Sequence, residues 1–106
     1  MKTLEFDAVG QDLKLVGPVK VKRGSKGGYL RARFHLDEEY DGADVVIASF
    51  GNSKGTDEVA VELDGSMVCQ FPDEVTDFPV ISVWLTCRTG DGAVFQTSRA
   101  MVPQRR

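Results

Sequence analysis

The sequence predicts one all-β domain, a single antiparallel β-sandwich of about eight or nine short strands that spans residues 1–106. Apolar and polar residues alternate with a period of two along most of the chain, which is the pattern of half-buried strands. Turn-forming residues interrupt this alternation roughly every 8–12 residues, as in other sandwiches. The length also suits a single domain with one core.

In the first half of the chain, the alternation predicts a series of strands that ends at residue 36. The clearest is 29–36, "YLRARFHL", with apolar residues on one face and Arg31, Arg33 and His35 on the other. The residues of these strands that we expect in the core are Leu4, Phe6, Leu13, Leu15, Val19, Val21, Leu30, Ala32, Phe34 and Leu36.

The second half continues the pattern and ends with strands at residues 93–97 and 100–102. The core residues expected here are Val46, Ala48, Phe50, Val59, Val61, Leu63, Met67, Cys69, Phe71, Ile81, Val83, Leu85 and Cys87. The opposite face of the long strand at 80–87 carries Val80, Ser82, Trp84 and Thr86.

The turns fall into two kinds. Asp64-Gly65 and Asp91-Gly92 are expected to close β-hairpins, because Asp-Gly accepts the backbone angles of a two-residue hairpin turn. Residues 25–28 ("SKGG") and 52–55 ("NSKG") are expected to form looser turns.

Two polar segments are expected to carry the chain between strands. Residues 37–44, "DEEYDGAD", form a longer crossing. Pro72 cannot donate a hydrogen bond to a strand ladder, so the preceding strand ends there. The acidic residues that follow Pro72 predict a single helical turn that leads into the next sheet.

Charge and composition exclude several classes of function. The net charge is −3, and the basic residues form only small clusters of the kind found at solvated edges, so we expect no nucleic-acid partner. No run of about 18 apolar residues occurs, and no apolar signal segment follows Met1. We therefore expect neither a membrane span nor export, and Cys69 and Cys87 are expected to be reduced thiols, with a disulfide as the alternative.

The sequence predicts no catalytic site and no cofactor, and an enzyme is the class least expected. His35 is the one histidine, and no nucleophile motif accompanies it, so we expect an exposed strand residue. The acidic residues of 37–44 lack EF-hand spacing, although a Ca²⁺ site there stays open. Zinc is not expected, because two cysteines and one histidine offer at most three soft ligands.

Trp84 is the main candidate for a contact surface, because a large aromatic on the outer face of a sandwich marks an interface. Val80 shares that face, and Tyr29 is a plausible aromatic companion, so these three residues form the predicted interface. The alternative is that a loop or a terminal strand buries Trp84. The chain ends, 1–7 and 103–106, are candidates for strand addition to a neighbour.

Most of the chain, residues 29–102, follows a recognisable order of features. Phe50 ends a strand, Cys69 follows an alternating strand and a Gly turn, and "Pro-x-Glu-Val" occupies 72–75. A valine-rich strand follows at 80–85, and Thr97-Ser98 lies in the last strand of this order. In this order the chain resembles the immunoglobulin-like or fibronectin-like sandwich domains of tailed-phage structural proteins of the baseplate, tail or fibre type. It departs from them at Trp84-Leu85, where the family often has Gly or Tyr-Gly.

The resemblance implies a non-enzymatic structural or assembly protein of a phage virion, made in the host cytoplasm. Its partners would be other virion proteins or itself, as a homo-oligomer. Because the chain ends at Arg106, we expect a small accessory, joining or decoration protein. The alternative is a carbohydrate- or cell-surface-binding module, and a third class is an enzyme inhibitor or host-takeover protein that uses loop 37–44.

Overall fold

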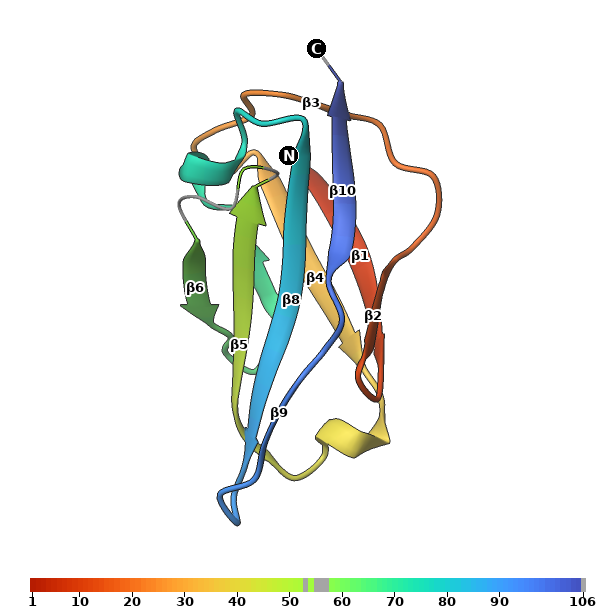
Figure 1. The fold of residues 1–106 in the computed structure, drawn as a ribbon, viewed down its shortest axis with the longest axis vertical. Helices are drawn as coiled ribbons and strands as arrows, with labels where there is room; N and C mark the ends of the chain where they lie inside the picture. The colour runs from red at the N-terminus through yellow and green to blue at the C-terminus, as the bar shows by residue number, and fades with distance from the viewer. Residues whose placement is uncertain (53, 55–57, 106) are drawn as a thin grey trace.

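The computed structural model describes residues 1–52, 54 and 58–105, which form two β-sheets packed face to face (Figure 1). The first sheet has four strands in the order β2-β1-β4-β7. Their bounds are Asp12–Leu15 for β2, Lys2–Val9 for β1, Leu30–Leu36 for β4 and Val68–Gln70 for β7.

The second sheet has six strands, in the order β3-β10-β8-β5-β6, with β9 also paired to β8. Their bounds are Val21–Lys22 for β3, Ala100–Arg105 for β10, Val80–Thr89 for β8, Ala43–Asn52 for β5, Val59–Glu62 for β6 and Val94–Gln96 for β9. β10 pairs with the first half of β8 and β9 with the second half, so both lie along the edge of β8 that faces away from β5.

Apolar side chains fill the space between the sheets, and the alternation predicts them well. Phe6 and Phe34 stack within the first sheet with ring centroids 5.3 Å apart, and Phe71 meets Phe50 of the second sheet at 5.0 Å. The predicted core residues that are only partly buried are Leu15, Val19, Leu36, Val59, Val61, Met67 and Cys69. The remaining predicted core residues are buried, which confirms the expected strand faces.

The all-β sandwich is confirmed, but its sheets are mixed rather than antiparallel throughout. β1 runs parallel to β4, in a register from Lys2 opposite Leu30 to Ala8 opposite Leu36. β3 also runs parallel to β10. Parallel strands need a long crossover, and residues 16–29 provide it by returning the chain to the end of the sandwich where β1 begins (Figure 1). The described residues form ten strands, and an immunoglobulin-like strand order stays a prediction.

The predicted hairpin at Asp64-Gly65 is wrong, because this turn joins two different sheets. β6 before the turn pairs with β5, whereas β7 after it pairs with β4. The Asp64 carboxylate accepts a hydrogen bond from the Ser66 N–H at 2.9 Å, and Met67 takes a left-handed conformation with φ of 55°. These two features bend the chain away from β6 and toward the first sheet.

The other predicted turns have different outcomes. Asp91-Gly92 closes the expected hairpin between β8 and β9. The chain also turns at 25–28, where the Tyr29 N–H donates to the Lys26 carbonyl. The turn expected at 52–55 includes residues that lie outside the described part of the chain.

Two 3₁₀ helices occur in the polar crossings, η1 at Glu38–Tyr40 and η2 at Asp73–Val75. η2 confirms the helical turn expected after Pro72, and it leads from β7 in the first sheet to β8 in the second. Among the described residues, no helix has the length and apolar character needed to cross a membrane.

Candidate binding site

Trp84 lies on the outer face of the second sheet, as its position in the alternation predicts, but its side chain is only 8% exposed. The ring lies over Gly51 of the neighbouring strand β5, where an added Cβ would come within 3.4 Å of a ring carbon. Arg99 covers the ring, with the guanidinium carbon 3.9 Å from the ring centroid. Trp84 is therefore buried by a neighbouring segment, as the alternative interpretation of the sequence expected.

The other residues of the predicted interface do not gather around Trp84. Val80 begins β8 on the same face and is half-buried. Tyr29 is 51% exposed but directly precedes β4, in the first sheet. The structure thus keeps Val80 and Trp84 on one face and places Tyr29 elsewhere.

The chain ends are largely used inside the domain. β4 pairs with Lys2–Ala8 along one edge of β1, whereas β2 pairs with only Phe6–Val9 along the other edge. In β10, Pro103 lies opposite Val80 of β8, while Gln104 and Arg105 pair with β3. Strand addition on the β4 side of residues 2–7 would therefore require an existing pairing to break, whereas no strand of the described part of the chain pairs with residues 2–4 on the other side.

His35 is an exposed strand residue, as predicted. Its Nε2 lies 2.7 Å from Glu5 Oε1, and Arg33 lies 3.4 Å from the other Glu5 oxygen. Both side chains therefore share one carboxylate on an outer face. No group of three His, Cys, Asp or Glu side chains in the described part of the chain is placed to hold a metal ion.

The acidic crossing at 37–44 is fastened to the β1–β2 turn. Asp37 accepts hydrogen bonds from the Gly10 N–H at 2.8 Å and the Glu39 N–H at 3.1 Å. The Tyr40 hydroxyl donates to the Gly10 carbonyl at 2.7 Å. Burial, aided by the negative charge of Asp37, raises the pKa of Tyr40 to about 12. Both Asp37 oxygens thus cap backbone groups, which gives the acidic residue a structural role.

Both cysteines are free thiols, as predicted. Cys69 is on β7 and Cys87 on β8, so they belong to different sheets. Burial raises the pKa of Cys69 to about 11 and also raises that of Cys87. Because the thiolate is the reactive form, both are poor nucleophiles near neutral pH.

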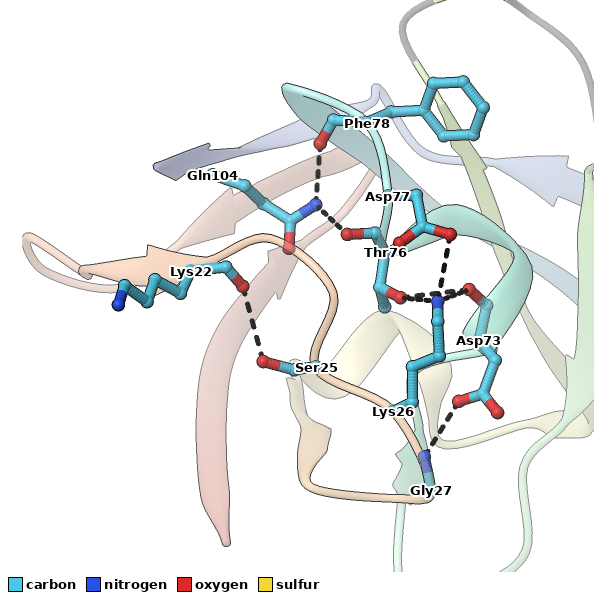
Figure 2. Close-up of polar contacts among 9 residues, drawn as sticks. All are labelled: Lys22, Ser25, Lys26, Gly27, Asp73, Thr76, Asp77, Phe78 and Gln104. Atoms are coloured by element: carbon cyan, nitrogen blue, oxygen red, sulfur yellow. Dashed lines mark hydrogen bonds and ion pairs between the residues drawn. The ribbon is translucent and has the colours of Figure 1, made fainter. Parts of the chain in front are cut away.

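A polar clamp holds the turn at 22–28 against η2 (Figure 2). The Lys26 ammonium donates to the Thr76 hydroxyl at 2.9 Å and to the Asp73 carbonyl at 3.0 Å, and it pairs with Asp77 at 3.1 Å. The Gly27 N–H donates to the Asp73 carboxylate at 3.0 Å. These bonds fix the segment that carries β3.

Gln104 joins β10 to the same region (Figure 2). Its buried amide nitrogen donates to the carbonyls of Thr76 at 3.0 Å and Phe78 at 2.7 Å. The Arg23 N–H donates to the Arg105 carbonyl at 2.8 Å. The end of β10 is therefore anchored on one side by residues 76–79, which follow η2, and on the other by the β3 segment.

A groove of about 830 Å³ opens between the edges of the two sheets, beside β2 and β10. Its walls are β2, the segment 16–20 that leaves β2, and β10 with the preceding Arg99; we call it the edge groove. Its charged lining residues are Lys14, Lys20, Arg99 and Arg105, and none of the described residues that line it is acidic. The groove is therefore strongly cationic although the whole chain has a net charge of −3.

β2 turns part of its backbone toward the edge groove. The Val16 N–H donates to the Glu5 carbonyl at 2.9 Å, which shows that Val16 faces β1. Backbone groups alternate in direction along an antiparallel strand, so Leu13 and Leu15 face away from β1. The Ser98 hydroxyl accepts from the Leu13 N–H at 3.2 Å, which leaves the Leu15 groups directed toward the groove.

β10 also turns backbone groups toward the edge groove, at Met101. The Gln104 N–H donates to the Pro79 carbonyl at 2.7 Å, so Gln104, and by alternation Val102, face β8. Met101 and Pro103 therefore face away from β8. Pro103 has no N–H, and β3 pairs with β10 only from Gln104 onward. Met101 thus presents both its N–H and its C=O on the groove side.

A smaller pocket of about 230 Å³ adjoins the edge groove and shares Lys20 and Arg105 with it. Lys2 and Lys22 add two more cations to its lining, and Tyr29 lies beside them. Of the three residues of the predicted interface, Tyr29 thus lines the smaller pocket, and Trp84 contacts Arg99 of the edge groove.

Sequence reasoning found the basic clusters but interpreted them as solvated edges. The sequence did not predict that Lys20 and Arg99 line the same groove, because a pattern of alternation does not show that β3 lies parallel to β10. The available signal was Gly17-Pro18, which stops β2 and sends the chain across to the second sheet.

Comparisons with known proteins add no assignment to this groove. A scan against protein-family models found no match, and searches of curated proteins and of solved structures found none either.

Proposed function

We propose that this chain is a non-enzymatic structural or assembly protein of a phage virion, a tail, baseplate, fibre or decoration component that works through protein–protein contacts. The observation that carries the proposal is the edge groove, where open strand backbone and four cations lie together at one side of a β-sandwich. Open strand edges are surfaces on which other chains pair. We infer a place in a virion from the resemblance of residues 29–102 to sandwich domains of tailed-phage structural proteins.

The geometry favours protein contacts over carbohydrate binding. Carbohydrate modules stack sugars on exposed aromatic rings, usually several in a row. Arg99 covers the ring of Trp84, and Tyr29 lies on the other sheet. The walls of the edge groove are instead strand backbone, aliphatic side chains and cations, which suit another polypeptide.

The direct test uses gradient-purified particles of a phage that encodes the chain, with quantitative mass spectrometry. We expect the chain in the particles at a fixed copy number relative to the major capsid protein. Its absence from purified particles, while it is abundant in the lysate of infected cells, would overturn the proposal.

Light scattering over a range of concentrations separates contacts between copies from contacts with other virion proteins. We expect a closed homo-oligomer whose mass is a small multiple of that of one chain. The variant Lys14→Glu, which places an acid in the groove, should lower that mass if copies associate through this surface. Lys54→Glu, an exposed change outside the groove lining, is the matched control.

A further inference from the structure

We propose that the edge groove binds an extended, acidic segment of a partner protein, which adds a short strand beside Met101 of β10. This inference rests on the proposed function, because it names the chemistry of the partner in a protein–protein contact. Charge, open backbone and the apolar parts of the walls each support it.

The cations of the groove make no ion pair with the described part of the domain, although Asp7 of β1 lies directly opposite Lys14. All the ion pairs among the described residues lie elsewhere, so Lys14, Lys20, Arg99 and Arg105 make none. Like charges around one groove repel each other, and carboxylates that arrive on another chain would remove this repulsion. The partner segment is therefore acidic.

The backbone of β10 fixes the conformation of that segment. Met101 presents an N–H and a C=O on the groove side, and pairing with them requires an extended chain. The open stretch is short, because the Ser98 N–H donates to the Gln11 carbonyl at one end and Arg105 is paired with the β3 segment at the other. At about 3.3 Å per residue, this space admits a strand of only four or five residues.

The walls also specify which side chains alternate in the partner. Leu15 and Val19 are partly buried and pack against the core, and Met101 is 53% exposed. They offer apolar contact between the cationic residues of the lining. Because side chains alternate along a strand, the matching partner carries apolar residues in one set of positions and carboxylates in the other.

The same lining argues against a nucleic acid as the occupant. Proteins that bind single strands stack bases on aromatic side chains in a basic groove. Among the described residues that line the edge groove, none is aromatic. A protein strand uses the open backbone at Met101, whereas a nucleic acid would leave it unpaired.

The test uses a fluorescein-labelled, end-capped six-residue peptide in which Val and Glu alternate, titrated into the full chain and followed by fluorescence anisotropy. We expect saturable binding and slower hydrogen exchange of the Met101 amide when the peptide is bound. The double variant Lys14→Glu/Arg105→Glu should weaken binding about tenfold or more, since two ion pairs become repulsive. The control Lys54→Glu should bind as the unsubstituted chain does.

Two control ligands separate strand addition from attraction between charges alone. The same peptide with alternate backbone amides N-methylated keeps its charge but cannot pair as a strand, and it should bind at least about tenfold more weakly. A peptide in which Lys replaces Glu should not bind. Equal affinity for the methylated peptide, no saturation at millimolar peptide, or tighter binding of a single-stranded oligonucleotide would each overturn the proposal.

The outcomes distinguish this inference from the function on which it rests. If the chain is found in purified particles but the peptide does not bind, the partner chemistry is wrong and the virion role stands. If the peptide binds and protects Met101 but particles lack the chain, the groove is a binding site and the virion role is wrong. Loss of peptide binding on self-association would identify a second copy as the occupant and overturn the inference of a different partner protein.

Discussion

The guanidinium group of Arg99 lies over the ring of Trp84 and also lines the edge groove. One exposed side chain thus separates the groove from the aromatic residue that the sequence marks as a contact. A ligand that draws Arg99 into the groove would uncover Trp84. Because the chain contains a single Trp, its fluorescence reports on the surroundings of this one ring.

Replacing Arg99 by Ala should expose the ring of Trp84 to solvent. The lost cation–π contact costs about 0.5–1 kcal/mol at an exposed site, so the fold should persist. We expect acrylamide to quench the fluorescence more efficiently in Arg99→Ala than in the unsubstituted chain. Arg88→Ala removes an exposed cation that pairs with Asp44 and should leave quenching unchanged. Equal quenching in both variants would contradict the covering role of Arg99.

Replacing Gly51 by Val should displace Trp84 by another route. The new side chain would meet the Ser82 hydroxyl and the Trp84 ring, which is held between Gly51 and Arg99. Overpacking of this kind costs about 1–3 kcal/mol, and urea denaturation would measure it. Gly42→Val is the control, because no atom lies within 4 Å of an added Cβ there. A loss of stability no larger than that of the control would show that the ring adjusts freely.

Stability should fall in alkaline solution because of Tyr40. Its pKa is raised from 10.0 to about 12, chiefly by burial, so the folded state keeps a proton that the unfolded state loses. The contribution of Tyr40 is therefore complete below pH 10 and is lost as pH rises through 12. Urea denaturation of the unsubstituted chain and of Tyr40→Phe across this range would measure it.

Tyr40→Phe also loses the hydrogen bond to the Gly10 carbonyl, which lowers stability by about 1 kcal/mol below pH 10. Above that pH, the unsubstituted chain should lose stability more steeply than the variant, and the two curves should converge. Parallel curves across the whole range would be inconsistent with the raised pKa of Tyr40.

Replacing Gln104 by Leu should destabilise the fold, because it leaves the carbonyls of Thr76 and Phe78 without their donor. Unpaired buried groups of this kind cost about 1–3 kcal/mol, and the urea midpoint should fall accordingly. Gln96→Leu changes an exposed glutamine on β9 and should cost less than about 0.5 kcal/mol. If the two variants have the same midpoint, Gln104 does not anchor β10.

Periodicity predicted the strand residues of the core, since burial imposes a period of two on any half-buried strand. It did not predict Tyr40 and Val75, which are buried in the two 3₁₀ helices. Phe6, Phe34 and Phe50 lie where the alternation places them. The helical turn after Pro72 was also predictable, because proline ends a ladder by local chemistry alone.

Strand partners were not predictable in the same way. Alternation gives the face of each strand but not its neighbour, so it does not distinguish a parallel from an antiparallel pair. The Asp64-Gly65 turn has hairpin residues, yet the left-handed Met67 directs the chain to the other sheet. Trp84 was placed on the correct face, but its cover comes from Arg99, whose approach depends on how β10 docks.

The parallel pairing of β1 with β4 delays completion of the first sheet during synthesis. β1 and β2 can pair as soon as both have left the ribosome, because a short loop closes at little entropic cost. β4 joins them only after the crossover at 16–29 has been made. The second wall of the edge groove arrives last, when residues 100–105 dock on β8. The edge groove is therefore incomplete on a nascent chain until β10 has been made and has docked.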